Sequence, residues 1–190
     1  MDSLDDQTGG IIDPKTVSPR PTGVQWGLIL GLASSVLAIV FLMTGMQDLS
    51  GQKSNWLPNV ISWAVMIGVL YTAATQHRDQ ELGGYITLGR VVSLGLWVTL
   101  ISGIIGGIFM FFYFSFIQPD FAQTIMQGAM DQAEKKGQDP EQVKKGMEMV
   151  SFMFKPWFFA VAGILGSLFF GLVFSLIIGL IVRKEQPRPF

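Results

Sequence analysis

Residues 157–182 read WFFAVAGILGSLFFGLVFSLIIGLIV, and no residue in this run carries a charge. A helix rises about 1.5 Å per residue, so roughly 20 apolar residues cross the ~30 Å hydrocarbon core of a bilayer. Lipid offers no hydrogen-bond partner to the backbone, which favours a helix because its own N–H and C=O groups bond to one another. The run therefore predicts a transmembrane helix.

Three further apolar runs share this pattern, and the charged residues lie between the runs. The chain of 190 residues is 49% hydrophobic and 14% charged, whereas a soluble domain carries about 25% charged residues. We therefore expect an all-α polytopic membrane protein, with the lipid bilayer as its surroundings. Its four transmembrane helices are predicted over residues 24–46, 58–76, 90–117 and 157–182.

Two short tails flank the predicted transmembrane domain, which covers residues 24–184. Residues 1–23 hold four aspartates and three prolines. Such a polar segment buries too little apolar surface to fold alone, so we expect a disordered N-terminal tail. Residues 185–190 form a C-terminal tail.

The longest segment between spans, residues 118–156, predicts an extramembrane helical hairpin between the third and fourth transmembrane helices. Asp120 can cap a first helix, and Gly137 can end it. Asp139 and Pro140 then favour a second start. Apolar residues recur at helical spacing in both parts: Phe121, Ile125, Met126, Ala129, Met130 and Ala133, then Val143, Met147, Val150 and Phe154.

The orientation follows from arginine and lysine near the span ends, because cytoplasmic loops are enriched in both. Counted over whole loops, the side of the two termini and the second loop holds seven Lys and Arg residues, and the other side holds six. The arginines are less evenly divided, because all five fall on the first side: Arg20, Arg78, Arg90, Arg183 and Arg188. We therefore expect both termini in the cytoplasm.

Small residues recur at every fourth position in all four runs, so each set lies along one ridge of its helix. In lipid, such ridges let helix backbones approach closely. The ridges can join the helices of one four-helix bundle, or they can join two copies in a homo-oligomer. The candidate helix-packing residues are Gly27, Gly31, Gly68, Gly95, Gly103, Gly107, Gly163, Gly171 and Gly179.

The second loop contains the only histidine, His77, at the start of the sequence HRDQELGG. His77 with Asp79 or Glu81 is one candidate acid–base or metal site. We expect no helix-borne partner beside these three residues, which leaves too few ligands for a metal. The structural interpretation is a polar connector in which Gly83 and Gly84 form the tight turn.

Absences limit the function further. The span interiors contain no Asp, Glu, Lys, Arg or His, and the chain has no cysteine. Proton-coupled transport and intramembrane proteolysis use polar or titratable groups within the membrane, so the sequence favours neither. We expect no enzyme, no cofactor and no metal, and the net charge of −1 gives no basic surface for nucleic acid. The candidates for a neutral polar path are Ser93, Thr99, Ser102, Ser167 and Ser175.

Three stretches of the chain carry a family resemblance. They are HRDQELGGYITLGRVVSLGLWVTLISGI from residue 77, FFYFSFIQPDFAQTIMQGAMDQAEKKG from residue 111, and LVFSLIIGLIVRKE from residue 172. The chain resembles the domain of unknown function 4199 family over about residues 24–184. The resemblance implies a small bacterial inner-membrane protein with four helices, and this family brings no assigned activity or site residues.

Two functional hypotheses remain. The leading one is a non-enzymatic membrane scaffold or accessory subunit, which acts through helix packing and through a hairpin that faces the periplasm. Its expected partner is another membrane protein or a second copy of the chain. The alternative is a small transporter or channel with a neutral polar path.

Overall fold

The computed structural model describes residues 16–47, 55–149 and 151–184, and these residues form helices and no strand. Four helices are long and apolar enough to cross a membrane, with spans of 24, 25, 30 and 27 residues. The predicted helical fold with four such spans is confirmed. The helices of the spans are α1 (Arg20–Met43), α2 (Leu57–Gln76), α3 (Leu88–Phe112) and α6 (Pro156–Val182).

Two of the four spans end in a π-helical turn. The segment η1 (His77–Glu81) continues α2, and η2 (Tyr113–Ile117) continues α3. The second span is therefore longer than its apolar run, because η1 adds five polar residues, of which His77, Arg78 and Glu81 contact other helices. The predicted tails over residues 1–15 and 185–190 lie outside the described residues.

The first helix begins at Arg20, four residues before the predicted start of its span. Prolines at the beginning of a helix are compatible with this, because the first N–H groups have no partner within the helix. The backbone N–H of Arg20 donates a hydrogen bond of 3.3 Å to the hydroxyl oxygen of Ser18. The polar residues 20–23, expected in the tail, therefore belong to α1.

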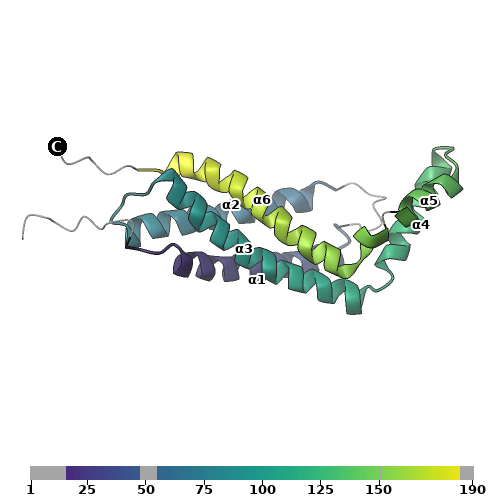
Figure 1. Cartoon of the computed structure of the whole chain (residues 1–190), viewed down its shortest axis with the longest axis horizontal. Helices are drawn as coiled ribbons and strands as arrows, with labels where there is room; N and C mark the ends of the chain where they lie inside the picture. Colours follow the sequence, from purple (N-terminus) through teal and green to yellow (C-terminus); the bar gives the residue numbers. More distant parts are fainter. Residues whose placement is uncertain (1–15, 48–54, 150, 185–190) are drawn as a thin grey trace, which may run out of the picture.

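The four long helices run side by side and alternate in direction, with both described ends of the chain at one end of the bundle (Figure 1). Helix α3 lies at the centre and makes its most extensive contacts with α6 and α1. Helix α2 packs more sparsely, mainly against α1 and α6. The apolar core holds Leu30 of α1, Leu70 of α2, Val98 of α3 and Ile178 of α6.

Most of the apolar surface of the spans faces outward. Only 22% of the most apolar window of each span is buried inside the bundle. Leu32, Phe169 and Ile181 are each more than 60% exposed. So large an apolar surface is unfavourable in water and favourable in lipid, which fits a multi-pass membrane protein.

Two shorter helices, α4 (Phe121–Lys135) and α5 (Pro140–Met149), connect α3 with α6. Helix α4 ends as Gly137 predicts, because this residue has a φ of +66° and the N–H of Gln138 bonds to the carbonyl of Ala133 at 2.8 Å. Asp120 precedes α4 without a side-chain cap bond, whereas the Asp139 carboxylate accepts the Glu141 N–H at 3.0 Å.

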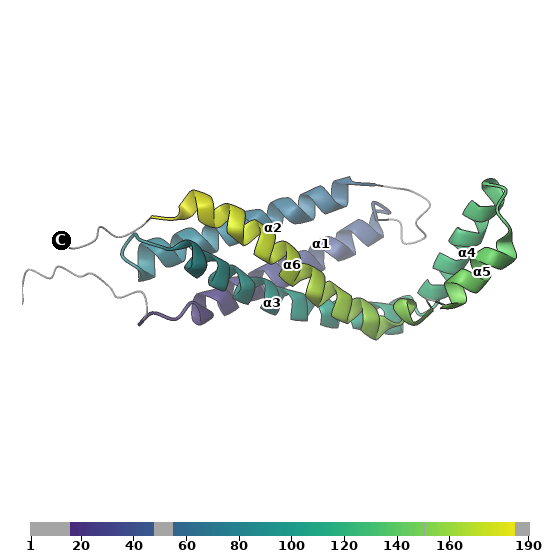
Figure 2. The ribbon, with the colours of Figure 1, turned by 45° about the horizontal axis from the view of Figure 1, so that its top comes forward.

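Together α4 and α5 form a segment that we call the arm, and it extends beyond the end of the bundle (Figure 2). The two helices pack against each other and against the short 3₁₀ helix η3 (Ser151–Phe154). All described residues of the predicted apolar stripes are buried or half-buried, and Val150 lies outside the described residues. The placement of the arm outside the membrane stays a prediction.

Candidate functional site

Glycines pack α3 against α1 on one side and against α6 on the other. At seven of the nine candidate packing glycines, an added Cβ would come within 3.2 Å of a neighbouring helix. The seven are Gly27, Gly31, Gly95, Gly103, Gly107, Gly171 and Gly179. Gly23 is packed in the same way, since an added Cβ would lie 2.5 Å from Trp97 Cβ. It was missed because its position was assigned to the tail.

The two remaining candidates, Gly68 and Gly163, lie differently. A Cβ at either position would have no atom of another residue within 4 Å. Neither glycine therefore serves a helix contact within this chain. In the second loop, Gly83 and Gly84 have φ values of +63° and +90°, which a glycine adopts without strain.

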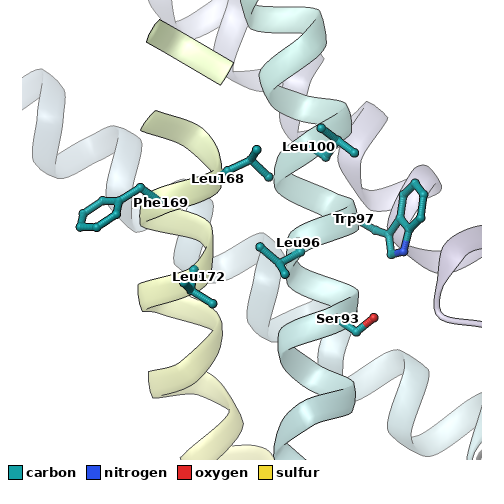
Figure 3. Close-up of a pocket in the computed structure, with 7 residues that line it drawn as sticks. All are labelled: Ser93, Leu96, Trp97, Leu100, Leu168, Phe169 and Leu172. Atoms are coloured by element: carbon teal, nitrogen blue, oxygen red, sulfur yellow. The ribbon is translucent and has the colours of Figure 1, made fainter. Parts of the chain in front are cut away.

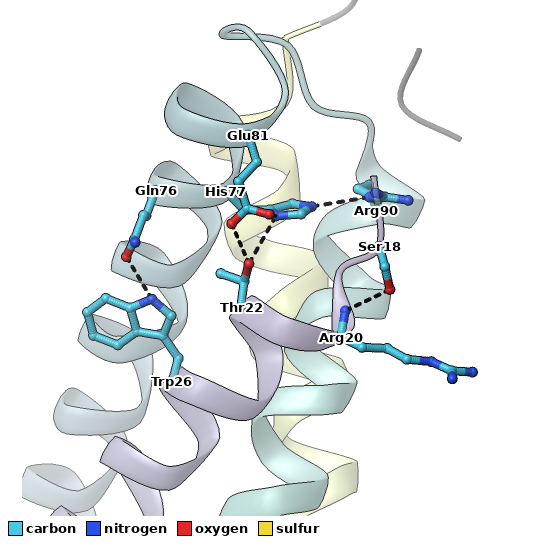
Figure 4. Close-up of polar contacts among 8 residues, drawn as sticks. All are labelled: Ser18, Arg20, Thr22, Trp26, Gln76, His77, Glu81 and Arg90. Atoms are coloured by element: carbon cyan, nitrogen blue, oxygen red, sulfur yellow. Dashed lines mark hydrogen bonds and ion pairs between the residues drawn. The ribbon is translucent and has the colours of Figure 1, made fainter. Parts of the chain in front are cut away.

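A partly buried polar cluster lies at the end of the bundle where both described chain ends are found (Figure 4). It consists of Thr22 of α1, His77 and Glu81 of η1, and Arg90 of α3, and we call it the polar cluster. Thr22 donates its hydroxyl hydrogen to Glu81 Oε1. Glu81 Oε2 lies 3.1 Å from His77 Nδ1, and Arg90 Nε donates to His77 Nε2 at 3.3 Å.

The contacts of the cluster define the protonation of His77. Because Arg90 always carries its protons, it can only donate, and His77 Nε2 must be the acceptor. His77 Nδ1 then carries the proton and donates to the Glu81 carboxylate. The imidazole is therefore neutral and lies between a cation and an anion, and its side chain is fully buried.

These partners correct the interpretation of His77 as part of a loop without helix-borne partners. Thr22 and Arg90 both stand in the first turns of long helices. Their positions along the sequence, 55 residues before His77 and 13 residues after it, gave no local signal. One signal was available: His77 follows the second predicted span and Arg90 begins the third, so both lie on the same side of the bundle.

Other contacts fasten the same end of the bundle. Arg78 forms a two-bond ion pair with Asp79 at 2.6 and 2.9 Å and donates to the carbonyl of Val182, the last residue of α6. The backbones of Ile86 and Lys184 exchange two hydrogen bonds of 2.9 and 3.0 Å. All four long helices are therefore joined by polar contacts at this end.

The chemistry open to the polar cluster is narrow. Both ring nitrogens of His77 have partners within the chain, Glu81 and Arg90. Among the described residues, no group of three or more His, Asp or Glu side chains could hold a metal ion. Arg90 Nη2 is buried and has no partner in the described part of the chain. The arrangement is suited to joining α1, α2 and α3.

Two of the five hydroxyl groups proposed for a neutral polar path, those of Ser102 and Ser167, belong to residues that line one pocket between the four long helices, and the other three are not in its wall. Thr99 donates to the carbonyl of Gly95 within α3, and Ser167 of α6 donates to the carbonyl of Thr99. Ser175 is buried against Gly95. Ser93 instead lines an apolar pocket between α3 and α6 (Figure 3).

That pocket has a volume of about 540 Å³, and leucine and aromatic side chains of α3 and α6 form most of its wall. Phe169 extends from α6 and Trp97 from the opposite side of α3 (Figure 3). Phe169 is 63% exposed. The pocket is therefore a feature of the apolar outer surface, where lipid tails are expected.

The sequence of the chain matches a known protein family. Residues 25–184 match the family described as "Protein of unknown function (DUF4199)". No curated protein and no solved structure matches the chain. Since the family match covers more than half of the sequence, and agrees with the resemblance of its three stretches, the chain belongs to the DUF4199 family.

Proposed function

We propose that this protein is a non-enzymatic scaffold or accessory subunit of a membrane assembly, and that the arm is its contact surface for another membrane protein. The observation that carries the proposal is the isolation of the arm. Helices α4 and α5 pack against each other and against η3. The long helices α1 and α2 are not among their main neighbours. A structural lid would instead lie on the bundle.

The root of the arm supports a role in presenting a surface. Phe121, the first residue of α4, packs on Phe114 of η2 and Phe159 of α6, with ring centroids 4.3 and 5.2 Å apart. Phe114 and Phe121 are 7% and 6% exposed. Three packed aromatic rings restrain the direction of the arm, and this lowers the entropy that a partner must remove on binding.

The outer face of the arm is polar and carries charges of both signs. Lys135, Glu141, Lys144 and Lys145 are exposed. Mixed exposed charges give an interface specificity for one partner more than they give affinity. We further propose a bacterial inner-membrane location with both termini in the cytoplasm, which places the arm in the periplasm. The arginine distribution supports this orientation.

The proposal is tested by isolating the tagged full-length chain in mild detergent and quantifying the membrane proteins that copurify. We expect one protein in a constant ratio to the chain. The double substitution Lys144→Glu with Lys145→Glu should remove this partner, because the reversed charges would face like charges across the interface, which is unfavourable. The matched control is Lys184→Glu, at the other end of the bundle.

Three results would count against this function. The first is repeated recovery of the chain alone as a monomer. The second is a partner that still copurifies with the double variant Lys144→Glu with Lys145→Glu. The third is a partner lost equally with Lys184→Glu, because the contact surface would then lie elsewhere.

A further inference from the structure

A second pocket lies between the four long helices, in the half of the bundle away from the polar cluster. Its volume is about 300 Å³, and α1, α2, α3 and α6 all contribute to its wall. None of the residues that line it is ionisable. We call it the interhelical cavity.

The position of the interhelical cavity follows from how the helices meet. Glycine contacts hold α1 against α3 at Gly23, Gly27 and Gly31. Beyond Gly31, residues of α1 such as Ser34 and Ala38 line the cavity instead. In this half of the bundle α1 and α2 separate from α3 and α6 (Figure 2).

Two glycines of the wall leave space open without enabling a helix contact. A Cβ at Gly106 of α3 or at Gly163 of α6 would meet no atom of another residue within 4 Å. Glycine in a helix costs about 1 kcal/mol relative to alanine. On the same helix as Gly106, Gly103 and Gly107 offset this cost through contact with α6. Gly106 and Gly163 gain nothing comparable from the chain itself.

An independent observation comes from the serine hydroxyl groups of the wall. Ser102 lines the cavity and is only 7% exposed, and no residue in the described part of the chain hydrogen-bonds its hydroxyl. The Ser102 hydroxyl is not among the fully buried polar atoms without a partner, so it keeps some accessible surface at the cavity. A hydroxyl that faces an apolar space without a partner is unfavourable. Three other wall serines avoid this by donating to backbone carbonyls at 2.8–2.9 Å: Ser35, Ser62 and Ser167.

We propose that the interhelical cavity binds an uncharged, membrane-dissolved molecule that carries a carbonyl or hydroxyl oxygen. That oxygen accepts the free hydrogen of Ser102. The apolar part of the molecule lies against the open backbone at Gly106 and Gly163 and against Trp63 and Phe170, whose ring centroids are 5.8 Å apart. A charged ligand is excluded because no ionisable group in the wall could compensate its burial.

The site is independent of the function proposed for the arm. No residue of α4 or α5 lines the cavity. If the arm has no partner protein, ligand binding in the cavity is unaffected. If the cavity binds no ligand, the contact surface of the arm is unaffected.

The test uses photolabelling of the full-length chain in phosphatidylcholine nanodiscs. The probes are a diazirine-bearing long-chain alcohol and an alkane of the same length with the same diazirine, and peptide mass spectrometry locates the adducts. We expect the alcohol to label residues of the cavity wall. The alkane should label the exposed outer surface of the spans.

Variants separate the cavity from the lipid-facing surface. Gly106→Leu should lower labelling of the wall by the alcohol about tenfold, because leucine fills the space that the probe needs. Gly166→Leu is the matched control, since it also has open space but does not line the cavity. Ser102→Ala should lower labelling by the alcohol severalfold and leave labelling by the alkane unchanged.

Thermal unfolding in detergent shows whether each variant is folded. If Gly106→Leu does not fold, Gly163→Leu replaces it with the same expectation. Alcohol adducts that are spread over the outer surface like those of the alkane would overturn the proposal. Wild-type labelling in a folded leucine variant would overturn it as well.

Discussion

At the scale of single residues, Gly171 shows how closely α6 approaches α3. A Cβ at Gly171 would overlap three atoms of the Thr99 side chain. We expect Gly171→Ala to lower the free energy of unfolding by about 1–3 kcal/mol, because the overlap forces the two helices apart. Denaturation in mixed detergent micelles measures this change.

The control for Gly171→Ala is Gly166→Ala on the same helix, where the added methyl group meets open space. Alanine is the better helix former, so this variant should be at least as stable as the wild type. Equal losses from both substitutions would show that α3 and α6 do not approach each other at Gly171.

Thr22 tests the polar cluster by the loss of one hydrogen bond. Thr22 is 3% exposed, and its hydroxyl is the partner of Glu81 Oε1. Thr22→Val keeps the shape and removes the donor, so we expect a loss of about 1–3 kcal/mol in unfolding free energy. Thr22→Ser keeps the donor and should retain most of the stability. The same micelle denaturation distinguishes them, and a Thr22→Val protein as stable as the wild type would refute the cluster's role.

At the scale of elements, the spans could be predicted because each depends on a local property, the length of an apolar run. The end of α6 at Val182 agrees with the prediction to the residue. Helix α2 also ends at the predicted residue, Gln76, but its helical span continues through η1 to Glu81. This continuation depends on Thr22 and Arg90, and no local pattern around His77 reports partners on other helices.

The glycines show the same limit of prediction in another form. Gly103 and Gly163 have equivalent spacing within their ladders, yet Gly103 contacts Ser167 and Gly163 faces open space. Spacing defines a ridge, but the rotation of each helix about its axis decides what that ridge meets. The rotation is set by all packing contacts together, so the sequence predicted the ridges and left their partners open.

The arm is an element whose direction depends on one aromatic contact. Phe121→Ala removes the ring that α4 places between Phe114 and Phe159. We expect amide hydrogen exchange in α4 and α5 to accelerate at least tenfold while exchange in the spans is unchanged, because large-to-small changes in packed sites cost about 3–5 kcal/mol. Phe116→Ala is the control, since Phe116 is 73% exposed. Unchanged exchange in the arm would contradict this anchoring.

At the scale of the whole molecule, polar contacts are concentrated at one end of the bundle. The polar cluster, the Arg78 contact with α6 and the backbone bonds of Lys184 all lie there. The other end holds the interhelical cavity and the root of the arm. The two ends therefore differ in their polar contacts and in charge, and the described arginines lie at the end with the polar cluster.

This asymmetry leads to a prediction of orientation. Arginine is retained on the cytoplasmic side during insertion, so residues beyond the polar cluster should be cytoplasmic and the arm periplasmic. Alkaline phosphatase folds only in the periplasm, because its disulfides need an oxidising compartment. Fused after Lys136 in the arm, it should be active, and fused after Gly84, in the turn between η1 and α3, it should be inactive. The opposite pair of activities would show that the chain has the reverse orientation, with the arm in the cytoplasm.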